Sequence, residues 1–220
     1  MEVTSLLVGV SEDDEILVAE NLSRAGSRFD WLFRLHSSGG QDTKFAALAI
    51  TNLGGLFAFQ KDAKVLVAGG FTNFAGVARN RIVRLYPDGN VDPSFDPGTG
   101  PNKAPLAIAV QPDGKILIAG AFTNFNGVAA CRVARLNPNG SLDSTFDAGT
   151  GPNSQVNALA LTPDGQVLVA GQFTSINGLP RNRIARLNGD DPAETSFVVC
   201  RRPLPDAPSV CLPMSRAGSR

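Results

Sequence analysis

Short apolar runs followed by a Phe-Thr dipeptide recur along the chain at a fixed distance. The run KVLVAG at residues 64–69 returns as KILIAG at 115–120 and, more loosely, as QVLVAG at 166–171. Two kinds of side chain keep the same spacing of 51 residues, a phenylalanine and an arginine: Phe71, Phe122, Phe173, Arg84, Arg135 and Arg186. A period of this length indicates tandem supersecondary units, each of which buries its apolar face against the next.

A degenerate copy opens the chain. EILVA at residues 15–19 matches the apolar run, and LFRL at 32–35 matches IVRL at 82–85. We therefore expect one repeat domain over residues 1–197, with four copies, repeats 1 to 4, at about 5–45, 54–95, 104–146 and 155–197. After Phe197 the pattern stops, and the proline- and arginine-rich residues 198–220 predict a tail or a linker.

Each copy predicts short antiparallel strands joined by tight turns. In repeat 4 the apolar stretches 156–161 and 167–170 are separated by Thr-Pro-Asp-Gly at 162–165. Proline presets φ for a type I turn, and glycine takes the left-handed conformation of the bulge that follows. A third strand is expected at 183–187, and a short fourth strand at the end of each copy.

This pattern predicts an all-β fold, a β-propeller of four tandem four-stranded blades of about 51 residues each. The first two strands are apolar on both faces, as expected for strands sandwiched between neighbouring sheets. A β-solenoid is the alternative, but its coils are usually shorter and lack paired hairpin turns. Since neither end offers a strand to complete a blade at the other, two arrangements stay open: a compact four-bladed ring, or an incomplete arc that self-associates through its terminal blades.

Charge and cysteine usage exclude several classes of function. The 20 basic residues balance 20 acidic ones, so neither nucleic acid nor an anionic membrane surface is an expected partner. No apolar run approaches the roughly 18 residues of a membrane-spanning helix, and the first residues lack the features of a secretion signal. The three cysteines come without a C-x-x-C pair or paired histidines, so we expect no metal and no other cofactor.

Three strings in repeat 3 resemble the delta-60 repeat: PDGKILIAGAFTNFNG at 112–127, RVARLN at 132–137 and GSLDSTF at 140–146. That family is a β-propeller-type repeat found mainly in large bacterial extracellular and surface proteins. The resemblance is specific in the last three copies, loose in the first, and covers about nine-tenths of the chain. It implies a propeller fold and a secreted or cell-surface setting, and it implies no catalytic activity.

A residue present in every copy is expected to serve the repeat itself, because an active site normally takes different residues from different blades. The recurring arginines are followed eight residues later by a carboxylate, and the pairs are Arg34 with Asp42, Arg84 with Asp92, Arg135 with Asp143, and Arg186 with Glu194. A partly buried guanidinium needs a carboxylate partner. We therefore predict a structural Arg–carboxylate clamp, with a ring of ligand-binding arginines as the alternative.

Three further features contain polar residues that could form a site. The linkers at 96–102 and 147–153 interleave Asp and Asn oxygens with glycine, which makes Asp96 and Asp147 weak calcium candidates, although each linker offers too few carboxylates alone. His36 is the only histidine, and without a nearby nucleophile it is expected to be a surface residue beside a turn. The acidic residues 12–15 are expected to form a solvated turn.

No catalytic constellation is visible, so the sequence favours a non-catalytic binding or scaffold module of a bacterial surface or secreted protein. Its partner would be a protein or a glycan. A propeller enzyme acting on glycans, a glycosidase or lyase, is the first alternative, but it needs unique acid and base residues on one face, and near-identical copies argue against it. A purely structural spacer is the second alternative.

Overall fold

The structure, a computed structural model, describes residues 2–11, 13–24, 27–45 and 47–187, and its regular elements are all β-strands. The described residues contain no helix, and so none that is long and apolar enough to cross a membrane. The predicted tail at 198–220 lies outside the described residues, as do Glu194 and the fourth strand expected in repeat 4.

Each repeat forms one antiparallel sheet. Repeat 1 gives a four-stranded sheet of β1 (Glu2–Val10), β2 (Ile16–Arg24), β3 (Ser27–Leu35) and β4 (Leu48–Ile50). Repeats 2, 3 and 4 give three-stranded sheets of β5 (Leu56–Phe59), β6 (Val65–Ala68) and β9 (Ile82–Leu85); β10 (Pro105–Val110), β11 (Ile116–Gly120) and β14 (Val133–Leu136); and β15 (Val156–Leu161), β16 (Val167–Gly171) and β19 (Ile184–Leu187).

The turns that join the first two strands of a repeat have the predicted geometry. In repeat 3, Gly114 donates to the carbonyl of Gln111 at 2.9 Å, and Gln111 donates to the carbonyl of Lys115 at 2.8 Å. Gly114 has φ +84°, the left-handed conformation that glycine adopts without steric cost. Local turn chemistry therefore fixes the register of β10 against β11.

Two features differ from the expected four-stranded pattern. The Phe-Thr segment of repeats 2 to 4 is a small hairpin rather than a loop, formed by β7 (Asn73–Phe74) and β8 (Val77–Ala78), β12 (Asn124–Phe125) and β13 (Val128–Ala129), and β17 (Ser175–Ile176) and β18 (Leu179–Pro180). The fourth strand of repeats 2 and 3 is a single bridge, Leu85 to Val91 and Leu136 to Leu142. It stops there because a turn follows at once, with Phe95 donating to the carbonyl of Asp92.

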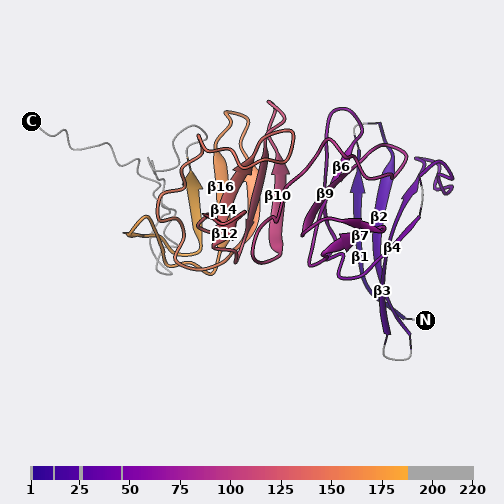
Figure 1. The fold of residues 1–220 in the computed structure, drawn as a ribbon, viewed down its shortest axis with the longest axis horizontal. Coiled ribbons are helices and arrows are strands. Elements are labelled where there is room, and N and C mark those ends of the chain that lie inside the picture. The colour runs from indigo at the N-terminus through magenta and orange to yellow at the C-terminus, as the bar shows by residue number, and fades with distance from the viewer. Residues whose placement is uncertain (1, 12, 25–26, 46, 188–220) are drawn as a thin grey trace, which may run out of the picture.

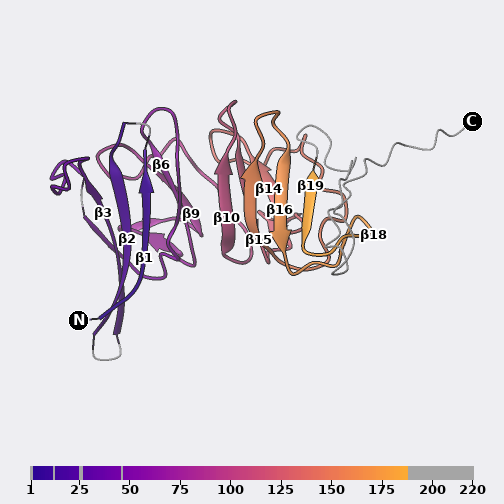
Figure 2. The same cartoon turned by 180° about the vertical axis from the view of Figure 1, so that it is seen from behind.

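The sheets stand one behind another in a row, with repeat 1 and repeat 4 at opposite ends of the long axis (Figures 1 and 2). Each sheet has a leading face toward the preceding repeat and a trailing face toward the following one. In repeat 2 the leading face carries Val65, Val67, Val83 and Leu85, and the trailing face carries Leu66, Ala68 and Ile82. Of the two arrangements left open by the sequence, the described residues show the open row and not a closed ring.

Three apolar cores fill the spaces between consecutive sheets. The core between repeats 2 and 3 joins Leu66 and Ile82 of one trailing face to Ile116 and Ile118 of the next leading face. The hairpin aromatics close each core from the side and are fully buried, namely Phe71, Phe74, Phe122, Phe125 and Phe173. Strands of this kind are apolar on both faces because each face belongs to a different core.

Candidate functional site

Each of the first three repeats holds its arginine between a carboxylate and an aromatic ring. Arg84 donates from Nε to Asp92 Oδ2 at 2.8 Å, and its guanidinium lies 5.1 Å from the centre of the Phe95 ring. The equivalent distances are 2.7 and 5.0 Å for Arg135 with Asp143 and Phe146, and 2.8 and 5.3 Å for Arg34 with Asp42 and Phe45. The structure therefore brings together the pairs that the sequence spacing indicated.

Asp92 and Asp143 stay ionised although both are buried. Desolvation by burial raises the pKa of each carboxyl, but it is outweighed by hydrogen bonds from Ser94 and Thr145, respectively, and by the neighbouring arginine. The pKa of both groups therefore lies far below its usual range. An aspartate held in this state has no proton to donate at neutral pH, so it is unsuited to general acid catalysis.

The fourth arginine is only partly described. Arg186 is half-buried, and its Nε has no hydrogen-bond partner among the described residues. The carboxylate that the sequence predicts for it, Glu194, lies outside them.

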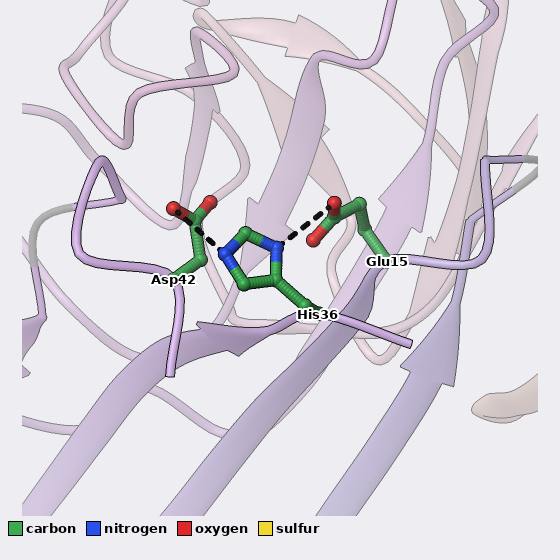
Figure 3. A group of neighbouring side chains, drawn as sticks. All are labelled: Glu15, His36 and Asp42. Atoms are coloured by element: carbon green, nitrogen blue, oxygen red, sulfur yellow. Dashed lines mark hydrogen bonds and ion pairs between the residues drawn. The ribbon is translucent and has the colours of Figure 1, made fainter. Parts of the chain in front are cut away.

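Sequence reasoning missed a cluster in repeat 1 that joins Glu15, His36 and Asp42 (Figure 3). His36 Nδ1 lies 3.2 Å from Glu15 Oε1, and Nε2 lies 3.7 Å from Asp42 Oδ1. Arg34 contacts both carboxylates, with Nε 2.8 Å from Asp42 Oδ2 and 3.7 Å from Glu15 Oε2. The hydrogen bond from Arg34 is the largest of the influences that lower the pKa of Asp42.

The geometry of this cluster is poorly suited to a metal ion. One ligand atom of each of the three residues lies within 4.8 Å of the others, but the two carboxylates face opposite nitrogens of the His36 ring (Figure 3). An ion bound to one nitrogen therefore meets only one carboxylate, and the Arg34 guanidinium already pairs with both.

The cluster marks a substitution within the repeat. Glu15 precedes β2 at the position that Lys64 and Lys115 occupy in repeats 2 and 3, where the lysine Nζ lies 3.5 Å from Asp92 and 2.9 Å from Asp143. Repeat 1 thus has a carboxylate where its neighbours have an ammonium group. A residue-by-residue comparison of the copies at this turn would have revealed the substitution, because Glu15 stands where repeats 2 and 3 have a lysine.

A cleft of about 520 Å³ lies between repeats 2 and 3, at the end of the sheets where the first turns lie. Repeat 2 contributes the turn residues Gln60, Lys61, Asp62 and Lys64, with Arg84 and Ser94. Repeat 3 contributes Gln111 and Pro112 from its first turn and Pro138 and Asn139 from its second. Arg84 spans the two repeats here, because its Nη1 donates to the carbonyl of Pro138 at 2.6 Å.

Two of the residues that line the cleft have a side-chain oxygen whose hydrogen bonding is incomplete. Gln111 is only 9% exposed, and its Oε1 is buried without a partner among the described residues, as is Oε1 of Gln60. Such groups cost free energy unless a donor reaches them. The rim is cationic: Lys61 is exposed, and the hydrogen bond to Asp62 raises the pKa of Lys64.

The linker aspartates have one oxygen engaged in their own turns. Asp96 Oδ1 accepts from the amide of Gly98 at 2.9 Å, and Asp147 Oδ1 accepts from Gly149 at 2.7 Å. Neither belongs to a group of three or more metal-ligating side chains within the ranges that the structure describes. The linker itself is latched to the next hairpin, since the amide of Gly100 donates to Asn126 Oδ1 at 2.7 Å.

Three segments of the chain, residues 60–95, 111–146 and 162–197, match the model of a family described as a domain of unknown function (DUF5122) β-propeller. Each match begins at the first turn of a repeat and ends at its last phenylalanine. No curated protein matches the chain. The chain is therefore an all-β, antiparallel protein with β-propeller-type repeats, and the description of the matched family names no activity.

Proposed function

We propose that this chain is a non-catalytic binding module, built as an arc of four β-propeller blades, whose ligand site is the cleft between repeats 2 and 3. The observation that carries the proposal is Gln111, a nearly buried amide that lines the cleft with its carbonyl oxygen unpartnered. A ligand that donates a hydrogen bond to this oxygen, once the side chain turns it toward the cleft, satisfies it without displacing an existing protein contact.

The chemistry of the lining favours a carbohydrate. Sugar hydroxyls are donors and suit the two amide oxygens of Gln60 and Gln111. The rim adds the exposed Lys61, which favours a sugar that carries a carboxylate or another acidic group. We therefore propose an acidic glycan as the ligand class.

A glycan array probed with the purified chain tests this proposal, followed by calorimetric titration of any oligosaccharide that binds. Gln111→Leu is expected to weaken binding about tenfold or more, because one hydrogen bond in a buried site is lost. Gln166→Leu is the matched control, since its Oε1 is also unpartnered but lies outside the cleft. Absence of binding to every glycan, or equal loss in both variants, would contradict the glycan assignment.

A glycan-cleaving enzyme is the second candidate, and the lining of the cleft counts against it. Hydrolysis of a glycosidic bond needs two carboxyl groups, one of them protonated. Asp62 is the one carboxylate among the lining residues. Desolvation raises its pKa, but the hydrogen bond and charge of Lys64 and two backbone hydrogen bonds together outweigh that effect, so the pKa is lowered. Release of shorter products from any acidic glycan would favour this candidate over a binding module.

The wider setting follows from the delta-60 resemblance of repeats 2 to 4. We propose a bacterial surface or secreted protein, in which a spacer role is the remaining alternative. Capture of acidic glycan from cell-envelope material by the wild-type chain, but not by Gln111→Leu, separates a binding module from a spacer.

A further inference from the structure

Among the residues that the structure describes, the row of sheets ends in two apolar faces without the partner sheet found at the internal interfaces. Between repeats 1 and 2, 2 and 3, and 3 and 4, a trailing face always packs on a leading face. The trailing face of repeat 4 and the leading face of repeat 1 are apolar like the faces at these internal interfaces, but they lie at opposite ends of the row (Figures 1 and 2).

The trailing face of repeat 4 is exposed where its equivalents are buried. Ile184 is 59% exposed, whereas Ile82 and Val133, at the same position of repeats 2 and 3, are 0% and 1% exposed. Leu168 and Ala170 are also partly exposed, although Leu117 and Ala119 are fully buried. Repeat 4 therefore keeps the apolar surface that a following sheet would cover.

The leading face of repeat 1 shows the complementary exposure. Val8 and Val10 of β1 are 51% and 58% exposed, and Ile16, Phe33 and Leu35 are only half-buried. Their counterparts in the next repeat, Val65, Val83 and Leu85, are at most 1% exposed.

The side chains on the two kinds of face also differ in size, and this difference makes a trailing face complementary to a leading face. Trailing faces carry at least one small residue on the first strand, such as Gly9, beside Leu7, in repeat 1 and the exposed Ala158 and Ala160 in repeat 4. Leading faces carry large ones, and Phe57 lies in the space that a β-carbon on Gly9 would occupy. A large-on-small fit of this kind joins unlike faces and disfavours the pairing of two trailing faces or two leading faces.

We propose that a second copy of this chain occupies the trailing face of repeat 4 with the leading face of its own repeat 1. The contact is heterologous, so two copies either close on each other or continue as a longer array. By sequence, residues 198–220 are a poor substitute, since they are rich in proline and arginine and do not repeat the apolar pattern from which a leading face is built. Arg84 of repeat 2 donates to the carbonyl of Pro138 in the second turn of repeat 3. Arg186 and Ser37 occupy the equivalent positions of repeats 4 and 1, so Arg186 of one copy is expected to donate to the carbonyl of Ser37 in the other.

Light scattering on the purified chain and on two charged variants tests the contact. The wild type is expected to be a dimer or larger, whereas Ile184→Glu, on the trailing face, and Val10→Glu, on the leading face, are each expected to be monomers. Ile184→Glu keeps an intact leading face, and Val10→Glu keeps an intact trailing face. A mixture of the two variants is therefore expected to form a complex of one copy of each and nothing larger. Val128→Glu, at a similarly exposed residue of a hairpin off both faces, should leave the wild-type mass unchanged.

Every outcome bears on the proposal. A monomeric wild type, or a mixture of variants that stays monomeric, overturns it. Self-association of Ile184→Glu alone or of Val10→Glu alone assigns the contact to like faces and also overturns it. Circular dichroism checks that each variant keeps its strand content, and Ala160→Arg and Val8→Glu form a second pair for the same mixing test if one of the first pair does not fold.

Discussion

Arg135 donates a hydrogen bond of 2.7 Å from Nε to Asp143 Oδ2, and the guanidinium lies over the ring of Phe146. Both charged side chains are buried, and Thr145 and Lys115 complete the contacts of the carboxylate. The pair sits on the trailing side of repeat 3, at the turn that replaces the expected fourth strand. It is therefore placed to hold the end of the repeat against its third strand, rather than to meet a ligand.

Arg135→Ala is expected to lower the free energy of unfolding by about 1–3 kcal/mol, because a buried carboxylate loses one of its two cationic partners and a hydrogen bond. Lys103→Ala, at an exposed lysine of the preceding linker, is the control and should have little effect. Urea unfolding followed by circular dichroism measures both. If the two variants are equally stable, the pair is not a structural clamp.

The same carboxylates predict how stability depends on pH. The pKa of Asp92 and of Asp143 is lowered in the folded protein, so each contributes stability above the unfolded-state pKa of about 3.9, and that stability is lost as the pH falls further. The free energy of unfolding should therefore hold between neutral pH and about pH 5 and fall below about pH 4. Asp143→Asn should give a less steep fall in the same urea experiments, and an identical slope would show that Asp143 does not contribute.

The elements that the sequence predicted correctly are those whose sequence signal lies within a few neighbouring residues. The strands β15 and β16 and the turn at Gly165 follow from two short apolar runs and the Pro-Asp-Gly triplet between them. The clamp of Arg84 and Asp92 also bridges only one turn, so its spacing was visible. Each of these signals is local, which is why a single sequence carried them.

Two of the features that the sequence did not predict depend on contacts beyond a single repeat. The cleft exists because the turn at Gln60 meets the two turns of repeat 3 around Gln111 and Pro138. The hairpin of β12 and β13 is held by the linker before it, since Asn102 Oδ1 accepts from the amide of Thr123 at 2.9 Å. Spacing alone does not say which turn of one sheet lies beside which turn of the next.

A close backbone approach at the end of β16 makes Gly171 a sensitive position. A β-carbon there would overlap the carbonyl oxygen of Gln155 and lie 2.8 Å from Cα of Val156, and neither atom belongs to a side chain that could rotate away. Gly171→Ala is therefore expected to lower the free energy of unfolding by roughly 1–3 kcal/mol. Gly40→Ala is the matched control, because its nearest neighbour is Ser38 Oγ at 3.8 Å. Equal thermal midpoints for the two variants would mean that the strands move apart at little cost.

The cluster of Glu15, His36 and Asp42 predicts the outcome of a metal titration. Zinc is expected to bind no more tightly to the wild type than to His36→Ala, because the ring nitrogens face different carboxylates and Arg34 lies against both. Calorimetric titration with zinc chloride, and the shift of the thermal midpoint on adding it, measure this. Tight binding that is lost in Glu15→Gln and in Asp42→Asn alike would show that the imidazole turns and Arg34 withdraws to make a three-ligand site. Binding lost in one of them alone would show that the metal takes one carboxylate and one ring nitrogen, as the opposed arrangement in Figure 3 allows.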